Sequence, residues 1–516
     1  MIPFAAPVDD ILFSLRDVAG AGALPEWDDD LARDIVRAFA DFAEREIAPL
    51  DAVGDRQGCR LENGRVRMPD GFAAAYGQLA AMGWQGLSAP EEHGGMGQGP
   101  LVAAMVSEVF AGANHAMQMV CNLVPGAIAT LHRYGTQAQQ DHWVPKLADG
   151  TALSTMCLTE PVAGSDLSAI RTRAVRDGEG WALTGEKVFI SGGDQDLSED
   201  ILHLVLARTG EAEGIRGLSL FLASKSGAGS TISVTRIEEK LGLHASPTCH
   251  MRFDRAPAEL IGAEGKGLAA MFTLMNHARI DVAFQGVAHA ARAFSIASAY
   301  AADRRQGRTA AGTPAVLSDH ADVQRMLDTQ RALTLGGRAM AHVTLVEMVR
   351  GDASALVDFL TPVCKVFCTE AGIRAADLGI QILGGYGYLT EYRISQTWRD
   401  ARITSIYEGA NGIHALATAT RGLRVQDGAG PDGFDALIGR LTNRAEVLAL
   451  RDRWRNARAT VESSDTPAAL AHAFMELTGQ LFYRAVWARI AEVGDTDALR
   501  RLAEQVIAPG PDWAAP

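Results

Sequence analysis

The chain has 516 residues, 47% of them hydrophobic and 21% charged, which is enough apolar material for several domain cores and argues against a disordered protein. Acidic side chains outnumber basic ones by 62 to 48, and the formal net charge of -14 opposes the attraction to phosphate that drives nucleic-acid binding. We therefore do not expect nucleic acid as a partner.

The apolar runs and the cysteines argue against a membrane-spanning protein and against a secreted, disulfide-stabilised one. No apolar run reaches the roughly 18 residues that a membrane helix needs, and the short apolar stretch at residues 11–13 follows two aspartates where a secretory signal would carry basic residues. The six cysteines are too scattered for a secreted disulfide framework. Cys364 and Cys368 have a spacing that metals can use on a helix, but we interpret them as buried thiols. The expectation is a cytoplasmic protein with no membrane insertion and no metal site.

The first part of the chain is expected to be helical. Apolar residues recur at helical spacing over residues 29–50, with Asp29 and Asp30 as candidate N-caps. Helical character continues to about residue 155. Residues 1–28 precede this pattern as an N-terminal extension.

The pattern changes between residues 156 and 262 to short β-rich segments separated by turn residues. Five strands are expected, at residues 182–190, 201–207, 218–222, 231–237 and 249–253. Helical spacing returns at Gly267 and is clearest over residues 323–333, after Ser318 as a possible cap.

A loop rich in Gly, Pro and Asp at residues 426–433 leads to a helical tail that extends to about residue 508. The order of helices, strands and helices predicts an α+β fold. Its expected parts are the N-terminal extension at 1–28, an N-terminal helical domain at 29–155, a middle β domain at 156–262, a C-terminal helical domain at 263–425, and a linker with the helical tail at 426–516.

Four ordered segments carry the strongest signal in the sequence. Residues 157–166 read CLTEPVAGSD, residues 185–193 read GEKVFISGG, residues 381–388 read QILGGYGY, and residues 402–411 read RITSIYEGAN. In this order and at this separation they resemble the acyl-CoA dehydrogenase family of flavoproteins over roughly residues 30 to 425.

The family resemblance implies both a fold and an activity. It implies a β-barrel-like middle domain and a C-terminal four-helix domain. It also implies an enzyme that uses FAD to convert an acyl-CoA thioester to a 2-enoyl-CoA and passes the electrons to an electron-transfer flavoprotein. Residues 190–200 and the extended N-terminus look most like the long branch of the family that includes 3-methylthiopropanoyl-CoA dehydrogenases.

Glu408 is the candidate catalytic base. The α-hydrogen of a thioester is very weakly acidic, so its removal needs a carboxylate on one face of the substrate, and the adjacent Gly409 leaves open space around that carboxylate. Burial in a flavin-covered pocket is expected to raise the pKa of Glu408. Some family members carry the base just before an arginine in a preceding helix, but here Ala278 stands before Arg279. If the Tyr-Glu-Gly segment stood alone, we would interpret Glu408 as a surface carboxylate that caps a helix, but the surrounding motifs favour the catalytic interpretation.

The resemblance also assigns residues to the cofactor and the substrate. Flavin contacts are implied for the pyrimidine edge, a ring beside the isoalloxazine and a hydrogen bond near N5, made by Leu158, Thr159, Phe189 and Ser191. Substrate contacts are implied for Ser165, which also matches a phosphate contact of the cofactor, and for Asn276, Arg279 and Gly409.

Arg304 matches a family arginine that reaches the FAD pyrophosphate of a neighbouring subunit, with help from Gln381 and Gly385 in the glycine-rich turn. The implied assembly is a homodimer or a homotetramer. Two positions depart from the family pattern: Ala410 stands where a threonine is usual and Gly412 where a polar residue is usual, so two side-chain donors toward the cofactor are missing, at about 0.5–1.5 kcal/mol each.

Two other function classes stay open on the sequence. The same fold hosts flavin oxidases and oxygenases, and it also hosts non-catalytic FAD-binding proteins that associate with nucleic acid. Oxygen consumption without an added acceptor would identify the first, and salt-dependent duplex binding would identify the second.

Overall fold

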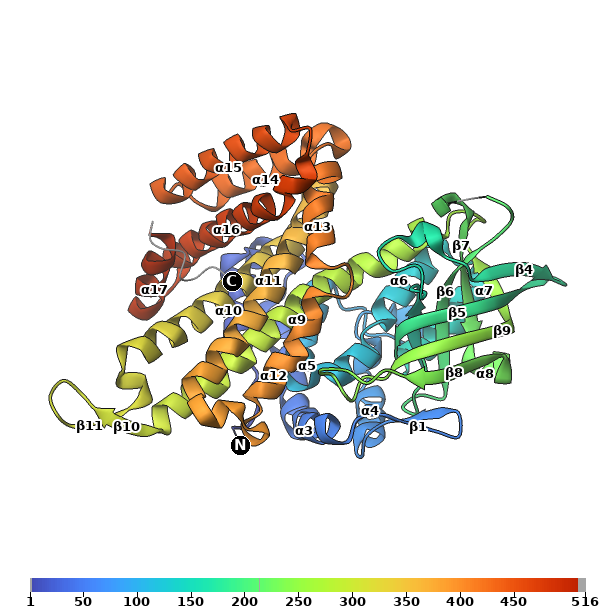
Figure 1. Ribbon diagram of the computed structural model, residues 1–516, viewed down its shortest axis with the longest axis horizontal. Helices are drawn as coiled ribbons and strands as arrows, with labels where there is room; N and C mark the ends of the chain where they lie inside the picture. Colours follow the sequence, from blue (N-terminus) through green and yellow to red (C-terminus); the bar gives the residue numbers. More distant parts are fainter. Residues whose placement is uncertain (1, 213, 509–516) are drawn as a thin grey trace. The chain divides into compact units, whose positions relative to one another are not determined.

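The computed structural model describes residues 2–212 and 214–508, and the predicted order of helices, strands and helices is confirmed (Figure 1). The chain forms two compact units. The first unit consists of Met1–Glu44, Pro100–Ala113 and Arg279–Pro516, and the second of Arg45–Gly99 and Asn114–Ala278.

Helices dominate the N-terminal third of the chain. They are α1 (Val8–Phe13), α2 (Asp29–Phe42), α3 (Ala48–Gln57), α4 (Phe72–Ala81), α5 (Pro100–Cys121), α6 (Val124–Tyr134) and α7 (Gln137–Ala148). A small antiparallel hairpin, β1 (Arg60–Glu62) with β2 (Arg65–Arg67), interrupts them.

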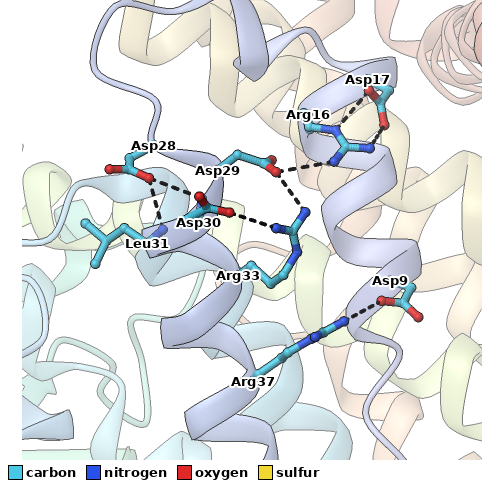
Figure 2. A network of polar contacts seen from close by, with 9 residues as sticks. All are labelled: Asp9, Arg16, Asp17, Asp28, Asp29, Asp30, Leu31, Arg33 and Arg37. Atoms are coloured by element: carbon cyan, nitrogen blue, oxygen red, sulfur yellow. Dashed lines mark hydrogen bonds and ion pairs between the residues drawn. The ribbon is translucent and has the colours of Figure 1, made fainter.

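The N-cap of helix α2 differs from the prediction, which named Asp29 and Asp30 as candidates. The Asp28 carboxylate accepts the backbone N–H groups of Asp30 at 3.1 Å and Leu31 at 3.0 Å, so Asp28 is the N-cap rather than Asp29 or Asp30 (Figure 2). Asp29 instead accepts a hydrogen bond from Arg33, one turn further along the helix, at 2.8 Å.

The middle of the chain is a single seven-stranded sheet, and each of the five expected strands is present. The strands are β3 (Ala152–Cys157), β4 (Arg173–Asp177), β5 (Gly180–Ser191), β6 (Asp200–Arg208), β7 (Leu218–Ser224), β8 (Ile232–Ile237) and β9 (Thr248–Ile261), with the short helix α8 (Lys225–Ala228) after β7. The pairings run from β6 through β4, β5, β9 and β7 back to β6, so the sheet closes on itself in the barrel-like manner that was expected.

The interior of this sheet is apolar and tightly packed. Trp181 on β5 meets Phe221 on β7 edge to face, with ring centroids 5.2 Å apart. Both rings belong to a buried cluster with Met251 and Phe253 of β9. This core makes β5 and β9 rigid supports for the residues that follow them.

The remainder of the chain is helical apart from one hairpin. The elements are α9 (Gly267–Asp303), β10 (Arg305–Arg308), β11 (Pro314–Val316), α10 (Ala321–Arg350), α11 (Ser354–Leu383), α12 (Ile394–Ala401), α13 (Asn411–Ala417), α14 (Ala429–Leu441), α15 (Ala445–Ser463), α16 (Pro467–Val493) and α17 (Asp497–Ile507).

Two expected boundaries in this part are wrong. Ser318 was expected as the cap of helix α10, but it lies within a separate 3-10 turn at Leu317–Asp319, and α10 begins at Ala321 with His320 as its N-cap. The expected loop at 426–433 is also shorter, since α14 already begins at Ala429 and includes Pro431 in its first turn, where proline is tolerated.

The N-terminal extension is tied to the first unit by ion pairs. Arg16 contacts Asp29 at 3.5 Å and Arg37 contacts Asp9 at 3.4 Å, which links the extension to α2 (Figure 2). Asp10 forms an ion pair with Arg331 of α10. These ion pairs make residues 9–16 of the extension part of the folded first unit.

A buried ion pair lies deeper in the same unit. The Arg338 guanidinium is fully buried and donates to Glu108 Oε1 from Nη2 at 2.7 Å and from Nε at 2.9 Å. Burial by itself would lower the pKa of Arg338, but the carboxylates of Glu108 and Asp10 outweigh it and raise that pKa. The buried pair joins α5 to α10.

The helical tail packs on α10 and α11. Tyr483 on α16 lies against Phe367 on α11, with ring centroids 4.8 Å apart, and Trp487 donates from Nε1 to the Ala332 carbonyl at 3.3 Å. Gly336 makes this approach possible, because a Cβ at that position would lie 2.2 Å from the Tyr483 ring. Among residues 2–212 and 214–508, no helix combines the length and the apolar character needed to cross a bilayer.

Candidate active site

The Glu408–Gly409 loop has an unusual backbone. It follows a 3-10 turn at Arg402–Ser405 and precedes α13. Glu408 has φ +53° and Gly409 has φ +95°, so two consecutive residues lie in the left-handed region, where a non-glycine residue costs about 1–2 kcal/mol. A Cβ on residue 409 would lie 2.6 Å from His414 Nε2, so glycine is required there. Strain of this kind is retained where the surrounding structure imposes it, and it commonly marks a functional loop.

The loop is fixed by hydrogen bonds from two helices. His414 Nε2 lies 3.0 Å from the Glu408 carbonyl oxygen, and because a carbonyl can only accept, this nitrogen carries the proton. Burial lowers the pKa of His414 to about 4, so the ring is neutral at ordinary pH. Lys365 Nζ on α11 donates to the Gly409 carbonyl at 2.9 Å and to Asn411 Oδ1 at 2.9 Å.

The other side of the loop is fixed through Tyr407. Its hydroxyl donates to Gln285 Oε1 on α9, and Gln285 in turn donates from Nε2 to Asp281 Oδ2 at 2.9 Å. Burial raises the pKa of Tyr407 well above its usual range, which keeps the phenol protonated and able to donate. Glu408 therefore follows a residue that cannot move without breaking this chain of bonds.

The Glu408 carboxyl group is buried although the residue as a whole is only half-buried. Its Oε2 atom is inaccessible, and no described residue forms a hydrogen bond with it. Burial raises the pKa of Glu408 to about 7, against the opposing effect of the Arg279 and Lys365 cations. A buried carboxylate oxygen without a donor is unfavourable by about 1–3 kcal/mol, and a carboxyl with a pKa near neutrality is suited to proton transfer.

Arg279 lies on α9 close enough to Glu408 for the two charges to affect each other. Burial lowers the pKa of Arg279, and the Glu408 carboxylate opposes that effect. The side chain of Asn276, predicted beside it as a substrate contact, lies outside the part of the chain that the structure describes.

The flavin residues predicted from the sequence lie in the second unit. Phe189 on β5 is exposed over 63% of its surface and has φ +58°, whereas Val188 and Ile190 on either side of it are buried. Ser191 ends the same strand and is partly accessible. An exposed aromatic ring next to a reachable hydroxyl fits the apolar face and polar edge of a flavin ring system.

Leu158 and Thr159 are held beside this strand by a buried lysine. Lys187 Nζ donates to the Leu158 carbonyl at 2.9 Å and to Glu160 Oε1 at 2.9 Å, and Val188 N–H donates to the Thr159 carbonyl at 2.9 Å. Ser165 lies apart in the exposed turn that follows. The structure thus brings Leu158 and Thr159 together with Phe189.

The predicted pyrophosphate residues lie in the first unit, in or beside the glycine-rich turn that follows α11. Gln381 and Gly385 are exposed, and a Cβ on Gly385 would meet nothing within 4 Å. The Arg304 guanidinium lies 5.4 Å from the centroid of the Tyr386 ring, so it is adjacent to the glycine-rich turn. Exposed guanidinium and backbone groups of this kind fit a diphosphate.

Comparison with known protein families decides the identity of the fold. The sequence matches the acyl-CoA dehydrogenase N-terminal domain over residues 29–151, the middle domain over 155–256 and the C-terminal domain over 265–423. The chain belongs to the acyl-CoA dehydrogenase family. The predicted class, an oxidoreductase that acts on acyl-CoA with FAD as its cofactor, is the class of this family.

Similar acyl-CoA dehydrogenases extend over most of the chain. The 3-methylmercaptopropionyl-CoA dehydrogenase of Ruegeria pomeroyi is 44% identical over 440 residues, covering 80% of this chain and 75% of that one. The structure of butyryl-CoA dehydrogenase from Megasphaera elsdenii superposes with a TM-score of 0.68 at 25% identity, over 77% and 98% of the two chains. Caenorhabditis elegans ACDH-11 in complex with C11-CoA, at 21% identity, shares the fold over 99% of this chain and 92% of its own, with a TM-score of 0.82.

The sequence did not indicate which residues hold the Glu408–Gly409 loop in place. These residues are Gln285, Lys365, Tyr407, Asn411 and His414. Lys365 gave one signal, as the single charge within the otherwise apolar segment at 363–368. The others are polar residues of types that are ordinary on helix surfaces, and only the fold shows that they converge on one loop.

Proposed function

We propose that this chain is an FAD-dependent dehydrogenase that introduces the α,β double bond into an acyl-CoA thioester. The observation that carries the proposal is the buried Glu408 carboxyl, with a pKa raised to about 7 by burial, on a strained loop that hydrogen bonds fix from several helices. Such a group is both available as a base at neutral pH and held in one position.

In this reaction Glu408, as the carboxylate, takes the α-proton of the substrate. Bound FAD would accept the β-hydrogen as a hydride, which leaves a carbon–carbon double bond and a protonated Glu408. The bonds to the carbonyls of Glu408 and Gly409 keep the loop peptide oriented, and we infer that the Glu408 backbone N–H donates to the thioester carbonyl and stabilises the negative charge that develops there. Leu158, Thr159, Phe189 and Ser191 would hold the flavin ring, and Arg304, Gln381 and Gly385 its diphosphate.

The proposed substrate is a short acyl-CoA that carries a thioether, as named for the Ruegeria relative. The test is an anaerobic screen in which the purified yellow protein is mixed with 3-methylthiopropanoyl-CoA, butyryl-CoA or a long-chain acyl-CoA. We expect the thioether substrate to bleach the flavin absorbance fastest, and the matching free acids without CoA serve as the control. If no thioester bleaches the flavin, the proposed function is wrong.

The electron acceptor is tested with the same protein. We propose an electron-transfer flavoprotein as the acceptor, so turnover in air should require that protein or an artificial dye. Oxygen consumption at the full rate without either one would instead indicate an oxidase.

The rate of flavin reduction is expected to depend on pH through Glu408. The base acts only when deprotonated, and its pKa is about 7, so the rate should rise from acidic pH and level off above neutrality. Below the inflection the rate should fall about tenfold for each pH unit. Stopped-flow reduction at saturating substrate measures this profile, and a rate that decreases with rising pH across the neutral range would contradict the assignment.

A further inference from the structure

Lys365 is a fully buried lysine next to the proposed base. It lies in the interior of α11 and has 0% exposure. Only six of the 48 basic residues in the chain are lysines, so this position uses the less common cation. A buried ammonium group is unfavourable unless something specific compensates it, so its presence calls for a reason.

The contacts of Lys365 all lead to the Glu408 loop. Its Nζ atom donates at 2.9 Å to the carbonyl of Gly409, the residue after the base, and at 2.9 Å to Asn411 Oδ1 at the start of α13. Asn411 is itself held by its Nδ2 atom, which donates to Glu370 Oε1 at 2.7 Å. One ammonium group therefore links the carbonyl of Gly409, within the left-handed turn, to Asn411 at the start of α13.

We propose that Lys365 is the positioning residue of the catalytic loop: it holds Glu408 and Gly409 in their left-handed conformation and keeps a positive charge beside the carboxylate. This inference rests on the proposed role of Glu408 as the base. Lys365 acts through the loop backbone and through its charge.

The charge state of Lys365 is consistent with the positioning role that its hydrogen bonds indicate. Burial lowers the pKa of Lys365 to about 8, and the carboxylates of Glu408 and Glu370 oppose that effect, so Lys365 is still mainly a cation at neutral pH. Its charge favours the ionised form of Glu408. The other titratable side chains that face this loop are Arg279 and Asp281 on α9, Glu370 on α11, Tyr407 before the base and His414 on α13.

The chemistry of the site favours lysine over arginine. The ammonium group is a compact charge whose donors can point to two acceptors in different directions, whereas a guanidinium is planar and matches a carboxylate or phosphate. Here the acceptors are one carbonyl and one amide oxygen from different residues. An apolar residue of similar length would fill the space but leave both oxygens without this donor.

The experiment compares Lys365→Met with the wild type and with Lys225→Met as a matched control. Lys225 is a partly buried lysine in the second unit that also donates to a carbonyl, that of Ile232 at 2.8 Å. For Lys365→Met we expect the rate of anaerobic flavin reduction to fall about 10²-fold, as for misplacement of a catalytic group by about 1 Å. We also expect the inflection of its pH profile to move upward, because a cation near Glu408 has been removed. Lys225→Met should match the wild type in both measurements.

A second variant and a second measurement separate positioning from charge and from folding. Asn411→Ala removes one acceptor but keeps the Lys365 charge, so the rate should fall while the pH inflection stays in place. Amide hydrogen exchange of the peptide at residues 405–414, followed in the protein without substrate, should become faster in both variants. This readout does not require turnover, so it still tests the positioning role if no thioester proves to be a substrate.

The inference is overturned if Lys365→Met reduces its flavin within about twofold of the wild-type rate, with the same pH inflection and unchanged exchange at residues 405–414. A wild-type protein that no thioester reduces would instead refute the proposed function. Equal loss of activity in the Lys225→Met control would show that any lysine removal destabilises the protein, and would likewise overturn the specific role of Lys365.

Discussion

Glu408→Gln is expected to keep its flavin bound and yellow and to lose the ability to be bleached by acyl-CoA. Glutamine has nearly the same shape as glutamate but cannot accept the α-proton, so the rate of reduction should fall roughly 10²- to 10⁴-fold, the usual range for general acid–base catalysis. The loop itself should persist, because the bonds from His414 and Lys365 go to backbone carbonyls and not to the carboxyl group. Anaerobic stopped-flow absorbance measures the rate, and the flavin content of the purified protein measures cofactor binding.

Glu476→Gln is the matched control for this substitution. Glu476 lies on the exposed face of α16, where its contact is an exposed pair with His472 at 3.4 Å. This variant should be reduced at the wild-type rate. Undiminished bleaching of Glu408→Gln would mean that another group takes the proton, and the assignment of Glu408 would have to be abandoned.

Arg338→Met is expected to reduce the free energy of unfolding more than any surface substitution in the first unit. Removing the guanidinium leaves the buried Glu108 carboxylate without its charge-assisted hydrogen bonds from Arg338, and breaking a buried pair in this way typically costs about 3–5 kcal/mol. The loss should appear as a lower urea midpoint and a lower thermal midpoint. Flavin bound to the folded protein should keep its normal spectrum.

A double variant separates the effect of leaving Glu108 without its ion-pair partner from the effect of the changed side-chain volume at position 338. Glu108→Leu combined with Arg338→Met removes both charges, so it should be more stable than Arg338→Met alone. Arg325→Met, which breaks an exposed pair with Asp322 on the same helix, should change the midpoints little. Equal midpoints for the single and double variants would show that packing, and not the buried charge, controls stability here.

Much of the fold could be predicted because its signals are local. Short β-rich segments separated by turn residues identified the five expected strands, and helical spacing identified helices on both sides of them. Two strands of the sheet, β3 and β4, were missed, and β3 already begins at Ala152, where helix was expected to about residue 155. The other errors occurred at boundaries, where competing local signals are close together. Three successive aspartates stand at the start of α2, and only the backbone geometry shows that Asp28, and not Asp29 or Asp30, accepts the first free N–H groups.

The site residues that could be predicted are those that lie within the sequence motifs. The Tyr-Glu-Gly segment indicated Glu408, and Phe189 was selected only because it stands within a longer motif. Lys365 stands out in the sequence as a lone charge in an apolar segment, but its contact with the loop could not be predicted, because it lies 43 positions before Glu408 and its bonds form only when α11 packs against the loop. Interactions of this kind depend on distances between remote segments, which a single sequence does not report.

The close approach of the Tyr483 ring to Gly336 limits which substitutions and deletions the helical tail can tolerate. Because the Tyr483 ring occupies the space that a side chain on α10 would need, α10 and α16 are complementary surfaces. Removing α16 would expose Phe367, against which Tyr483 packs, to solvent. Conversely, a side chain at position 336 would fit only with a smaller residue at 483, so the two positions constrain each other.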